Sequence, residues 1–301
     1  QDPVFEAQTK NKRGSTEVRS WIVNAVRDQV VLWLHKNPEG AEQLLAKVKS
    51  NERVRKELSA IKKEARERAK KVAIRIPKLI DCKIHLNDPK GKRRDDTTIF
   101  LTEGDSAGGA MIQARDVLTQ AIYSLKGKPL NTHGLGREAV YKNEELYNIM
   151  RALGIEDSLD GLRYNRVVIA TDADVDGMHI RNLLLTYFLR YFEELVLKRH
   201  VFILETPLYR VRNRSETVYC YSEAERDAAA ARLRNPEITR FKGLGEISPG
   251  EFKQFIATDD RLVPVIVGSM GAVAKALDFY MGKNTPARKD YIIQNLIADI
   301  A

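Results

Sequence analysis

The pattern of apolar and polar positions divides the chain into a helical first part and a second part in which strands and helices alternate. Between Glu17 and Lys36, and again from about Asn51 to Val72, apolar residues recur every three or four positions, which predicts two amphipathic helices. The segment from Asn37 to Gly40 (NPEG) interrupts the first run, because proline and glycine end helices. The first part should therefore contain two helices joined by an irregular segment.

The pattern changes in the second part of the chain. Thr97 to Thr102 (TTIFLT) predicts a strand, Gly104 to Gly109 a tight turn, and Ala110 to Leu118 a helix. A similar unit follows, since Val167 to Thr171 is a continuous apolar run typical of a strand buried on both faces, and Ile180 to Leu197 predicts a long helix. Strand, turn and helix in succession, twice, indicate an α/β fold with a parallel sheet flanked by helices.

Shorter elements are expected after this sheet. Val201 to Leu204 predicts another strand, and Leu208 to Arg212 with Thr217 to Tyr221 predicts a hairpin. Glu223 to Leu233 has a helical pattern. Ser248-Pro249 has the residue types that begin a helix, and a mostly helical tail is expected to follow.

Charge adds a candidate partner. The chain has 50 Lys and Arg residues against 41 Asp and Glu, a formal charge of +9, so its field attracts polyanions such as nucleic acid. The excess gathers between Lys47 and Arg75, where twelve basic residues stand against four acidic ones. Pairing between residues four apart does not neutralise such an excess. Two interpretations of this stretch stay open, a solvated helix and a helix that faces DNA.

Cysteine use and hydrophobicity exclude several classes of protein. Cys82 and Cys220 stand far apart without C-x-x-C spacing, so neither a zinc site nor a disulfide framework is expected. No apolar run reaches the roughly 18 to 20 residues that cross a bilayer, and the N-terminus lacks a signal-peptide pattern. We therefore expect a soluble cytoplasmic protein with no membrane partner. The chain opens at Gln1 without methionine, which suggests a fragment of a longer polypeptide.

The feature that points to chemistry is an acidic triplet, Asp172, Asp174 and Asp176, at the carboxyl end of the second predicted strand. This end of the strands is where α/β sheets bind their ligands. In an extended segment, residues two apart share a side, so the three carboxylates are expected to converge. Because like charges this close repel, a cation is expected, and carboxylate oxygens suit Mg²⁺ or Mn²⁺.

Glu103 stands in the same relation to the first predicted strand. If the two strands are neighbours, Glu103 completes the acidic site. Carboxylates that share one or two Mg²⁺ ions would orient a phosphodiester and stabilise its leaving oxygen, with Glu103 available as general acid or base. The plain alternative is a solvated turn in which an aspartate caps the following helix.

Other chemistries share parts of these motifs. An EF-hand loop also begins Asp-x-Asp-x-Asp-Gly but needs Glu at its twelfth position, which is Leu183 here. Phosphatases that use an Asp at the end of a strand as their nucleophile have Thr or Val at the position that Asp176 occupies here. Gly104 to Gly108 satisfies G-x-S-x-G, the nucleophile elbow of α/β-hydrolases, with Ser106 as nucleophile. No HGGG-type oxyanion segment lies upstream of this motif. A hydrolase function would also not explain the acidic triplet.

Five motifs in order give the chain a family resemblance. They are Gln8 to Lys10 (QTK), Glu103 to Gly109 (EGDSAGG), Leu125 to Asn131 (LKGKPLN), Asp172 to Arg181 (DADVDGMHIR) and Lys242 to Glu246 (KGLGE). With these motifs the chain closely resembles the B subunit of bacterial type IIA DNA topoisomerases. The resemblance implies three regions: the end of the transducer with linker helices (1–96), the TOPRIM metal-binding domain (97–215) and a C-terminal tail (216–301).

The resemblance also implies roles for individual residues. Glu103, Asp172 and Asp174 match the family's catalytic metal ligands, with Asp176 as a further acid. The positions that match DNA contacts are Lys128, Asn131, His179, Lys242 and Arg288. Gln8 and Lys10 match a loop that reaches ATP in the neighbouring domain of the full-length protein, although this chain has no ATPase motif of its own.

The implied enzyme is a DNA topoisomerase that works with partners. Its cofactor is Mg²⁺, with Mn²⁺ or Ca²⁺ as substitutes, and ATP serves only the full-length protein. The nucleophilic tyrosine belongs to the A subunit of an A2B2 assembly on double-stranded DNA, in the bacterial cytoplasm with the chromosome. Alone, the chain should be inactive. Leu130 to Thr132 and Ile76 to Cys82 favour topoisomerase IV over gyrase. The alternatives are a nuclease or primase with the same domain, and a DNA-binding scaffold without catalysis.

Overall fold

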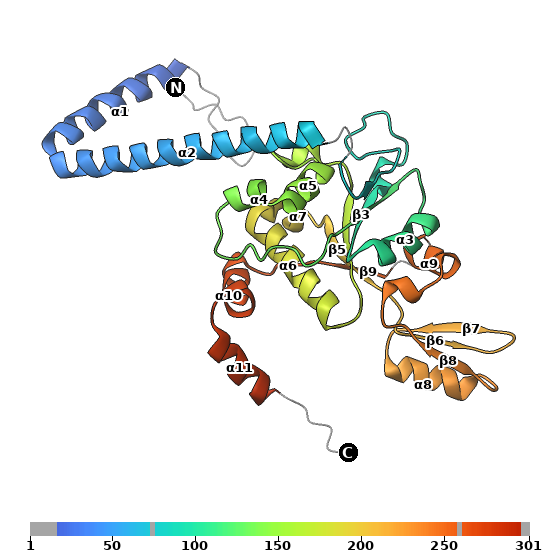
Figure 1. Ribbon diagram of the computed structural model, residues 1–301. Coiled ribbons are helices and arrows are strands. Elements are labelled where there is room, and N and C mark those ends of the chain that lie inside the picture. Colours follow the sequence, from blue (N-terminus) through green and yellow to red (C-terminus); the bar gives the residue numbers. More distant parts are fainter. Residues whose placement is uncertain (1–16, 73–75, 258–260, 296–301) are drawn as a thin grey trace. The chain divides into compact units, whose positions relative to one another are not determined.

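The structure is a computed structural model that describes residues 17–72, 76–257 and 261–295 (Figure 1). It divides into two compact units, residues 1–63 and 64–301, and each unit is considered by itself. No helix in the described ranges combines the length and the apolar character that crossing a bilayer would require.

The helices are α1 (Glu17–Lys36), α2 (Pro38–Val72), α3 (Asp105–Ala114), α4 (Glu138–Lys142), α5 (Glu144–Leu153), α6 (Val175–Tyr191), α7 (Glu193–Leu197), α8 (Glu223–Arg232), α9 (Pro249–Ala257), α10 (Met270–Met281) and α11 (Thr285–Gln294), with short 3₁₀ turns η1 (Arg94–Asp96), η2 (Leu159–Gly161) and η3 (Leu244–Glu246). The strands are β1 (Leu79–Ile80), β2 (Thr98–Thr102), β3 (Gln120–Ser124), β4 (Arg166–Ala170), β5 (Val201–Glu205), β6 (Tyr209–Arg212), β7 (Thr217–Cys220), β8 (Glu237–Arg240) and β9 (Arg261–Pro264).

The first unit contains α1 and most of α2, joined by the single residue Asn37. The N–H of Asn37 donates to the carbonyl of Trp33 (3.0 Å), and its carbonyl accepts from the N–H of Ala41 (2.9 Å). Helix α1 occupies the predicted range. Helix α2 begins at Pro38 and not near Asn51 as predicted, because proline fits the first turn of a helix, where its missing N–H is not needed.

The second unit is built on a six-stranded sheet in the order β1-β3-β2-β4-β5-β9. Strands β3, β2, β4 and β5 are parallel, while β1 and β9 pair antiparallel at the two edges. In the central pair of this sheet, Thr102 at the end of β2 lies beside Ala170 at the end of β4. The predicted α/β fold with a mostly parallel sheet is confirmed.

Helices cover both faces of this sheet. On one face, Phe100, Ile122 and Val168 of the strands pack into one core with Met111 of α3 and Phe252 of α9. Figure 1 shows α5, α6 and α7 on the opposite face. Every residue of β2 and of β3 is buried, as expected for strands between two helical layers.

The sequence pattern does not predict β3 or α5. Strand β3 has polar residues at both ends, and the Gln120 amide becomes buried only because it donates to the carbonyl of Ile256 in α9 (2.6 Å). The sequence does contain residues typical of the two ends of helix α5. Asn143 caps its first turn, and Gly154 ends it in a left-handed conformation.

Helix α3 begins at Asp105, earlier than the predicted start at Ala110. Gly108 and Gly109, which were expected in a tight turn, lie inside this helix, and Gly104 precedes its first residue. A Cβ at Gly108 would lie 2.4 Å from the hydroxyl oxygen of Ser124 in β3. Glycine is therefore needed there for close packing of the helix on the sheet.

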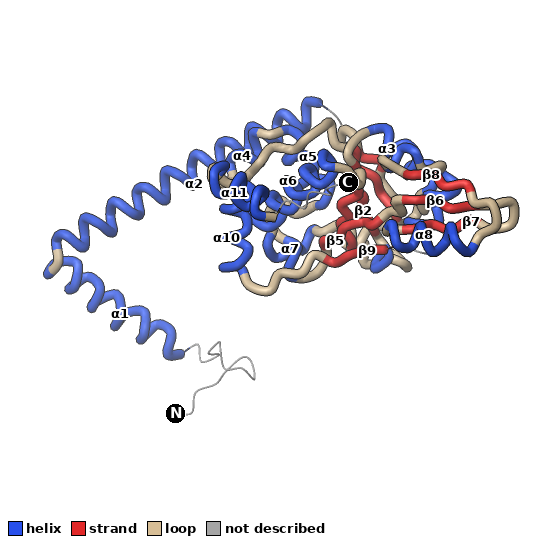
Figure 2. The backbone as a smooth tube through the Cα atoms, turned by 90° about the horizontal axis from the view of Figure 1, so that it is seen from below, coloured by secondary structure: helices blue, strands red, loops and turns tan. Residues whose placement is uncertain are grey.

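A second, smaller sheet carries the order β7-β6-β8 and packs against α8. Figure 2 shows both sheets in red among the helices. The predicted β6–β7 hairpin is confirmed, and α9 begins at Pro249 as predicted. The tail is mostly helical as predicted, and its one strand in the described residues, β9, joins the central sheet beside β5.

Candidate metal and DNA site

Two acids meet at the carboxyl edge of the central sheet. Glu103 directly follows β2, and Asp172 follows β4 after one intervening residue. Because β2 and β4 are neighbouring parallel strands in register, their ends bring the two residues together. The backbone nitrogen of Asp172 lies 3.4 Å from Glu103 Oε2. The sequence-based expectation that these strands are neighbours is confirmed.

The electrostatics of this edge favour a cation. Burial raises the pKa of Glu103, and the nearby charges of Asp172, Asp174 and Asp176 raise it further. Burial also raises the pKa of Asp172, with Asp174 adding to the effect, while a hydrogen bond from the N–H of Leu244 opposes it. Glu103 and Asp172 thus resist ionisation, first because they are partly buried and then because other acids are close, and a divalent cation would relieve that repulsion. The donor set fits a metal that prefers oxygen ligands.

The acidic triplet is not extended. Helix α6 begins at Val175 and not at Ile180 as predicted, because the side chain of Asp174 caps it. The Oδ1 atom of Asp174 accepts from the N–H of Gly177 (2.8 Å). The segment therefore lacks the strand-like alternation from which the convergence of the three carboxylates was predicted. The alternative of an aspartate acting as helix cap holds for Asp174, which keeps its second oxygen for another partner.

Asp176 lies in the first turn of α6 and pairs with Lys128, its Oδ1 atom 2.7 Å from the lysine Nζ. This ion pair lowers the pKa of Asp176 and raises the pKa of Lys128. Both side chains are exposed, so the pair can open to other partners. The start of α6 at the fourth position of the motif also contradicts an EF-hand, whose loop needs twelve residues between helices.

The KGLGE motif contributes through its backbone. The N–H of Leu244 donates to Asp172 Oδ1 (2.8 Å), and a Cβ at Gly243 would lie 2.7 Å from Asp172 Oδ2. Lys242 is exposed, and its backbone N–H donates to Glu246 (2.9 Å). The sequence predicted a phosphate contact for Lys242 and missed that its neighbours hold Asp172. No local pattern could reveal that contact, since it joins segments far apart in the chain.

Three of the residues predicted to contact DNA gather beside α6. Asn131, His179 and Arg288 line a cavity of about 510 Å³ between α6 and the turn that joins α10 to α11. The Asn131 side chain donates to the carbonyl of Met281 (3.0 Å). The guanidinium of Arg288 donates to three carbonyls at and just after the end of α10 (3.4, 2.8 and 2.9 Å), so it already serves as a helix cap.

Other predicted residues fall outside this site. Ser106 lies within the first turn of α3, whereas a nucleophile elbow presents its serine at the turn before a helix. Gln8 and Lys10 lie outside the described residues.

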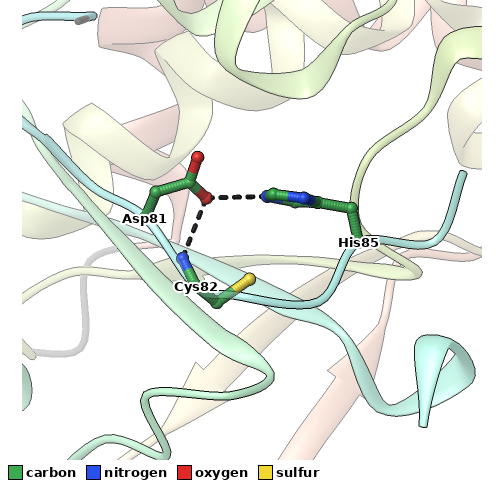
Figure 3. Close-up of side chains that lie close together, drawn as sticks. All are labelled: Asp81, Cys82 and His85. Carbon is green, nitrogen blue, oxygen red and sulfur yellow. Dashed lines mark hydrogen bonds and ion pairs between the residues drawn. The ribbon is translucent and has the colours of Figure 1, made fainter. Parts of the chain in front are cut away.

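A separate cluster at the end of β1 was not predicted. Asp81, Cys82 and His85 are the only three described residues whose potential ligand atoms all lie within 4.8 Å of one another, so the acids at the sheet edge are more widely spaced (Figure 3). His85 Nε2 lies 3.0 Å from Asp81 Oδ1. The guanidinium of Arg163 contacts Asp81 and lies 2.7 Å from His85 Nε2, and the Tyr164 hydroxyl donates to Asp81 (2.6 Å).

This cluster does not have the chemistry of a metal site. Burial raises the pKa of Cys82 to about 11, and its thiol donates to the carbonyl of Ile84 (3.0 Å), whereas a metal ligand must be a thiolate. Arg163 already supplies the positive charge beside Asp81. The cluster therefore clamps the segment after β1 to the segment before β4. The sequence shows the Asp-Cys-x-x-His spacing but cannot show that Arg163 contacts both Asp81 and His85.

Comparisons with known proteins agree with this geometry. Residues 98–206 match the Toprim domain, and residues 1–65 match the DNA gyrase B family. The four parallel strands of the central sheet, with their acidic carboxyl edge, thus belong to a Toprim domain.

Over 298 residues the chain is 56% identical to the B subunit of DNA topoisomerase 4 from Borreliella burgdorferi, covering 98% of this chain and 50% of that protein. It is 36% identical over 304 residues to the B subunit of DNA gyrase from Mycoplasmoides gallisepticum, covering 98% of this chain and 46% of that protein. The chain belongs to the family of B subunits of bacterial type IIA DNA topoisomerases.

A solved structure supports the same assignment. The DNA-binding, cleavage and re-ligation domain of Plasmodium falciparum topoisomerase II superposes with a TM-score of 0.62 at 28% identity, covering 75% of this chain and 32% of that one. The chain spans about half the length of the curated relatives it matches.

Proposed function

We propose that this chain supplies the metal-binding, DNA-cleaving part of a type IIA topoisomerase, which cuts and rejoins duplex DNA and, as a full enzyme, changes DNA topology with ATP. The observation that carries the proposal is the meeting of Glu103 and Asp172 at the ends of two neighbouring parallel strands. The similarity to topoisomerase B subunits over nearly the whole chain supports it.

Glu103, Asp172 and Asp174 would hold the metal, and Asp176 is close enough to add charge. We propose Mg²⁺, with Mn²⁺ or Ca²⁺ as substitutes, because carboxylate oxygens suit these ions. Bound there, the ion would neutralise charge on a phosphodiester and on its leaving oxygen.

The chain's own residues have distinct parts in this proposal. Glu103 can give or take a proton at the leaving oxygen. The backbone of Gly243 and Leu244 keeps the Asp172 carboxylate in place. Lys128 can exchange its exposed pairing with Asp176 for a DNA phosphate, which leaves Asp176 free to face the metal.

DNA and a second subunit complete the proposed enzyme. Since the relatives are named as B subunits, we infer an A subunit that carries the catalytic tyrosine, in an A2B2 assembly on double-stranded DNA. Asn131, His179, Lys242 and Arg288 remain proposed DNA contacts. Gln8 and Lys10 are proposed to reach ATP in the full-length protein. The proposed location is the bacterial cytoplasm, with the chromosome.

The 56% identity to one topoisomerase 4 B subunit favours topoisomerase IV over gyrase. The discriminating measurement uses the full-length protein with its A subunit. Separation of interlinked DNA circles is expected. Introduction of negative supercoils into relaxed circles would instead identify a gyrase.

The central experiment mixes the chain with a candidate A subunit and linear duplex DNA, with and without Mg²⁺. Cleavage should need both the A subunit and the metal. Glu103→Gln and Asp172→Asn should each lower cleavage by several orders of magnitude, since each removes a proposed metal ligand.

The same experiment separates the alternatives. Ser106→Ala would abolish an esterase, whereas we expect no ester hydrolysis to abolish. Nicking of DNA without the A subunit would favour a nuclease. Full cleavage by Asp172→Asn would overturn the metal site and favour a DNA-binding scaffold.

A further inference from the structure

Lys78 lies at the same edge of the central sheet as the proposed metal ligands. Strand β1 runs antiparallel to β3 with Leu79 beside Tyr123, so the start of β1 lies at the carboxyl end of β3. The N–H of Ser124, the last residue of β3, donates to the carbonyl of Lys78 (3.2 Å). Glu103 follows β2, the next strand of the sheet. The backbone of Lys78 is therefore two strands, or about 10 Å, from the end of β2.

The conformation and the pairing of Lys78 do not explain each other. Its φ is 63°, in the left-handed region that only glycine enters without a steric cost. Its Nζ atom lies 2.5 Å from Asp105 Oδ2, and the two side chains are 37% and 71% exposed, so the ion pair adds little stability. The contacts of Asp81 with Arg163 and Tyr164 already hold the segment after β1. The ion pair alone therefore does not account for a lysine at this strained position.

Two lysines flank the acidic site in the same way. Lys128 pairs with Asp176 of one acidic motif, and Lys78 pairs with Asp105 of the other. Each of these two acids stands two residues after a proposed metal ligand. A lysine carries a compact charge on a flexible stem, so it can move from an exposed carboxylate to a phosphate without a change in the fold.

The charge of the site gives these lysines a purpose. Glu103, Asp172 and Asp174 carry three negative charges when ionised, so one divalent cation leaves one of them uncompensated. A DNA phosphate brings a further negative charge to this edge, and positive side chains beside the metal lower the resulting repulsion. Asp105 is exposed, so water can solvate its carboxylate once Lys78 has moved away.

We infer that Lys78 is a further DNA contact of the proposed cleavage site and binds a backbone phosphate beside the metal after it leaves Asp105. The inference rests on the proposed function, and it gives a role to a segment, Ile76 to Cys82, that the proposal does not use. Because the contact is to a phosphate, it positions the DNA without reading its bases.

The test measures the affinity of the chain and its A subunit for duplexes in which one phosphate is replaced by a neutral methylphosphonate. The replacement is moved through the positions around the cleavage site, with Mg²⁺ present and at low salt, where screening is weakest. At one or two neighbouring positions the neutral group should lower wild-type affinity by up to about five-fold, the most that an exposed ion pair contributes. The same replacement should not lower the affinity of Lys78→Gln further, and such non-additivity identifies a direct contact.

Lys83→Gln is the matched control. Lys83 is exposed and follows β1 at the opposite edge of the sheet, where its N–H donates to the carbonyl of Val117 before β3. This variant, and Lys78→Arg, which keeps the charge, should respond to each neutral phosphate as the wild-type protein does. Equal responses of Lys78→Gln and the wild-type protein at every phosphate would overturn the inference.

Lys78→Gly separates a DNA contact from a structural role. Because glycine relieves the left-handed backbone, the urea midpoint should equal or exceed that of the wild-type protein, while the response to the neutral phosphate is lost as in Lys78→Gln. A lower urea midpoint with unchanged DNA affinity would show that the pair with Asp105 only supports the fold, and would also overturn the inference. In either case the wild-type protein still cleaves DNA with the A subunit and Mg²⁺, whereas failure of the proposed function would leave it unable to do so.

Discussion

Gly243→Ala tests how the Asp172 carboxylate is held in place. Gly243 has φ −144° and ψ 161°, an extended conformation that alanine adopts without strain. The added Cβ would lie 2.7 Å from Asp172 Oδ2, whereas ordinary contact begins at 3.4 Å. The carboxylate must therefore move by about 0.7 Å, or the KGLGE segment must move with it. Either shift disturbs the hydrogen bond from the N–H of Leu244.

The size of the effect follows from what that shift disturbs. A hydrogen bond to a charged group contributes about 1.5–3 kcal/mol when it is intact. A misplacement approaching 1 Å in a reacting geometry costs about 100-fold in rate. We expect Gly243→Ala to slow DNA cleavage by about 100-fold and to raise the Mg²⁺ concentration needed for half-maximal cleavage. Single-turnover cleavage with the A subunit across a Mg²⁺ titration measures both quantities.

Gly250→Ala is the matched control, because a Cβ there meets no atom within 4 Å. It should cleave like the wild-type protein. If Gly243→Ala also cleaved normally at every Mg²⁺ concentration while remaining folded, the proposal that contact with the KGLGE backbone sets the position of Asp172 would be refuted.

The remaining predictions concern stability and reactivity. Because burial raises the pKa of Cys82 to about 11, maleimide at pH 8 should label it only as fast as the protein unfolds, and rapid labelling of folded protein would contradict that environment. Although burial raises the pKa of Glu251, bonds including the 2.7 Å contact from Arg210 lower it to about 2. Its stabilisation should be complete above pH 4.5 and disappear towards pH 2, and urea midpoints for Glu251→Gln should lack that part of the pH dependence. Glu145→Ala leaves the N–H of Lys126 without its acceptor at 2.5 Å and should lower the free energy of unfolding by about 1–3 kcal/mol, whereas an unchanged urea midpoint would show that water replaces the carboxylate.

Local patterns predict much of the fold and the position of the acids. The apolar runs that became β2 and β4 are buried on both faces, and such strands are parallel neighbours in most α/β sheets. Since parallel strands end at one edge, Glu103 and Asp172 could be placed together from the sequence alone. The repulsion expected between these carboxylates then indicated a cation, although the positions of the side chains were not known.

The parts that the sequence could not supply depend on competition between local and distant contacts. Asp174 could continue a strand or cap a helix, and the hydrogen bond from the N–H of Gly177 favours the cap. Gly108 was predicted in a turn because glycine is common there, but Ser124 across the sheet is what requires it. Arg163, which contacts Asp81, and Leu244, which contacts Asp172, come from segments about 70 or more residues later in the chain, which no periodicity records.

Strand β9 sets a limit on how the protein can be shortened. Its residues, Arg261–Pro264, pair with β5 and form the outer border of the central sheet. A truncation before Arg261 would keep every proposed metal ligand, yet would leave β5 with a row of unpaired N–H and carbonyl groups. Such an open border recruits strands from other molecules and leads to aggregation. The solubility of the catalytic domain thus depends on a four-residue strand that carries none of the proposed metal ligands.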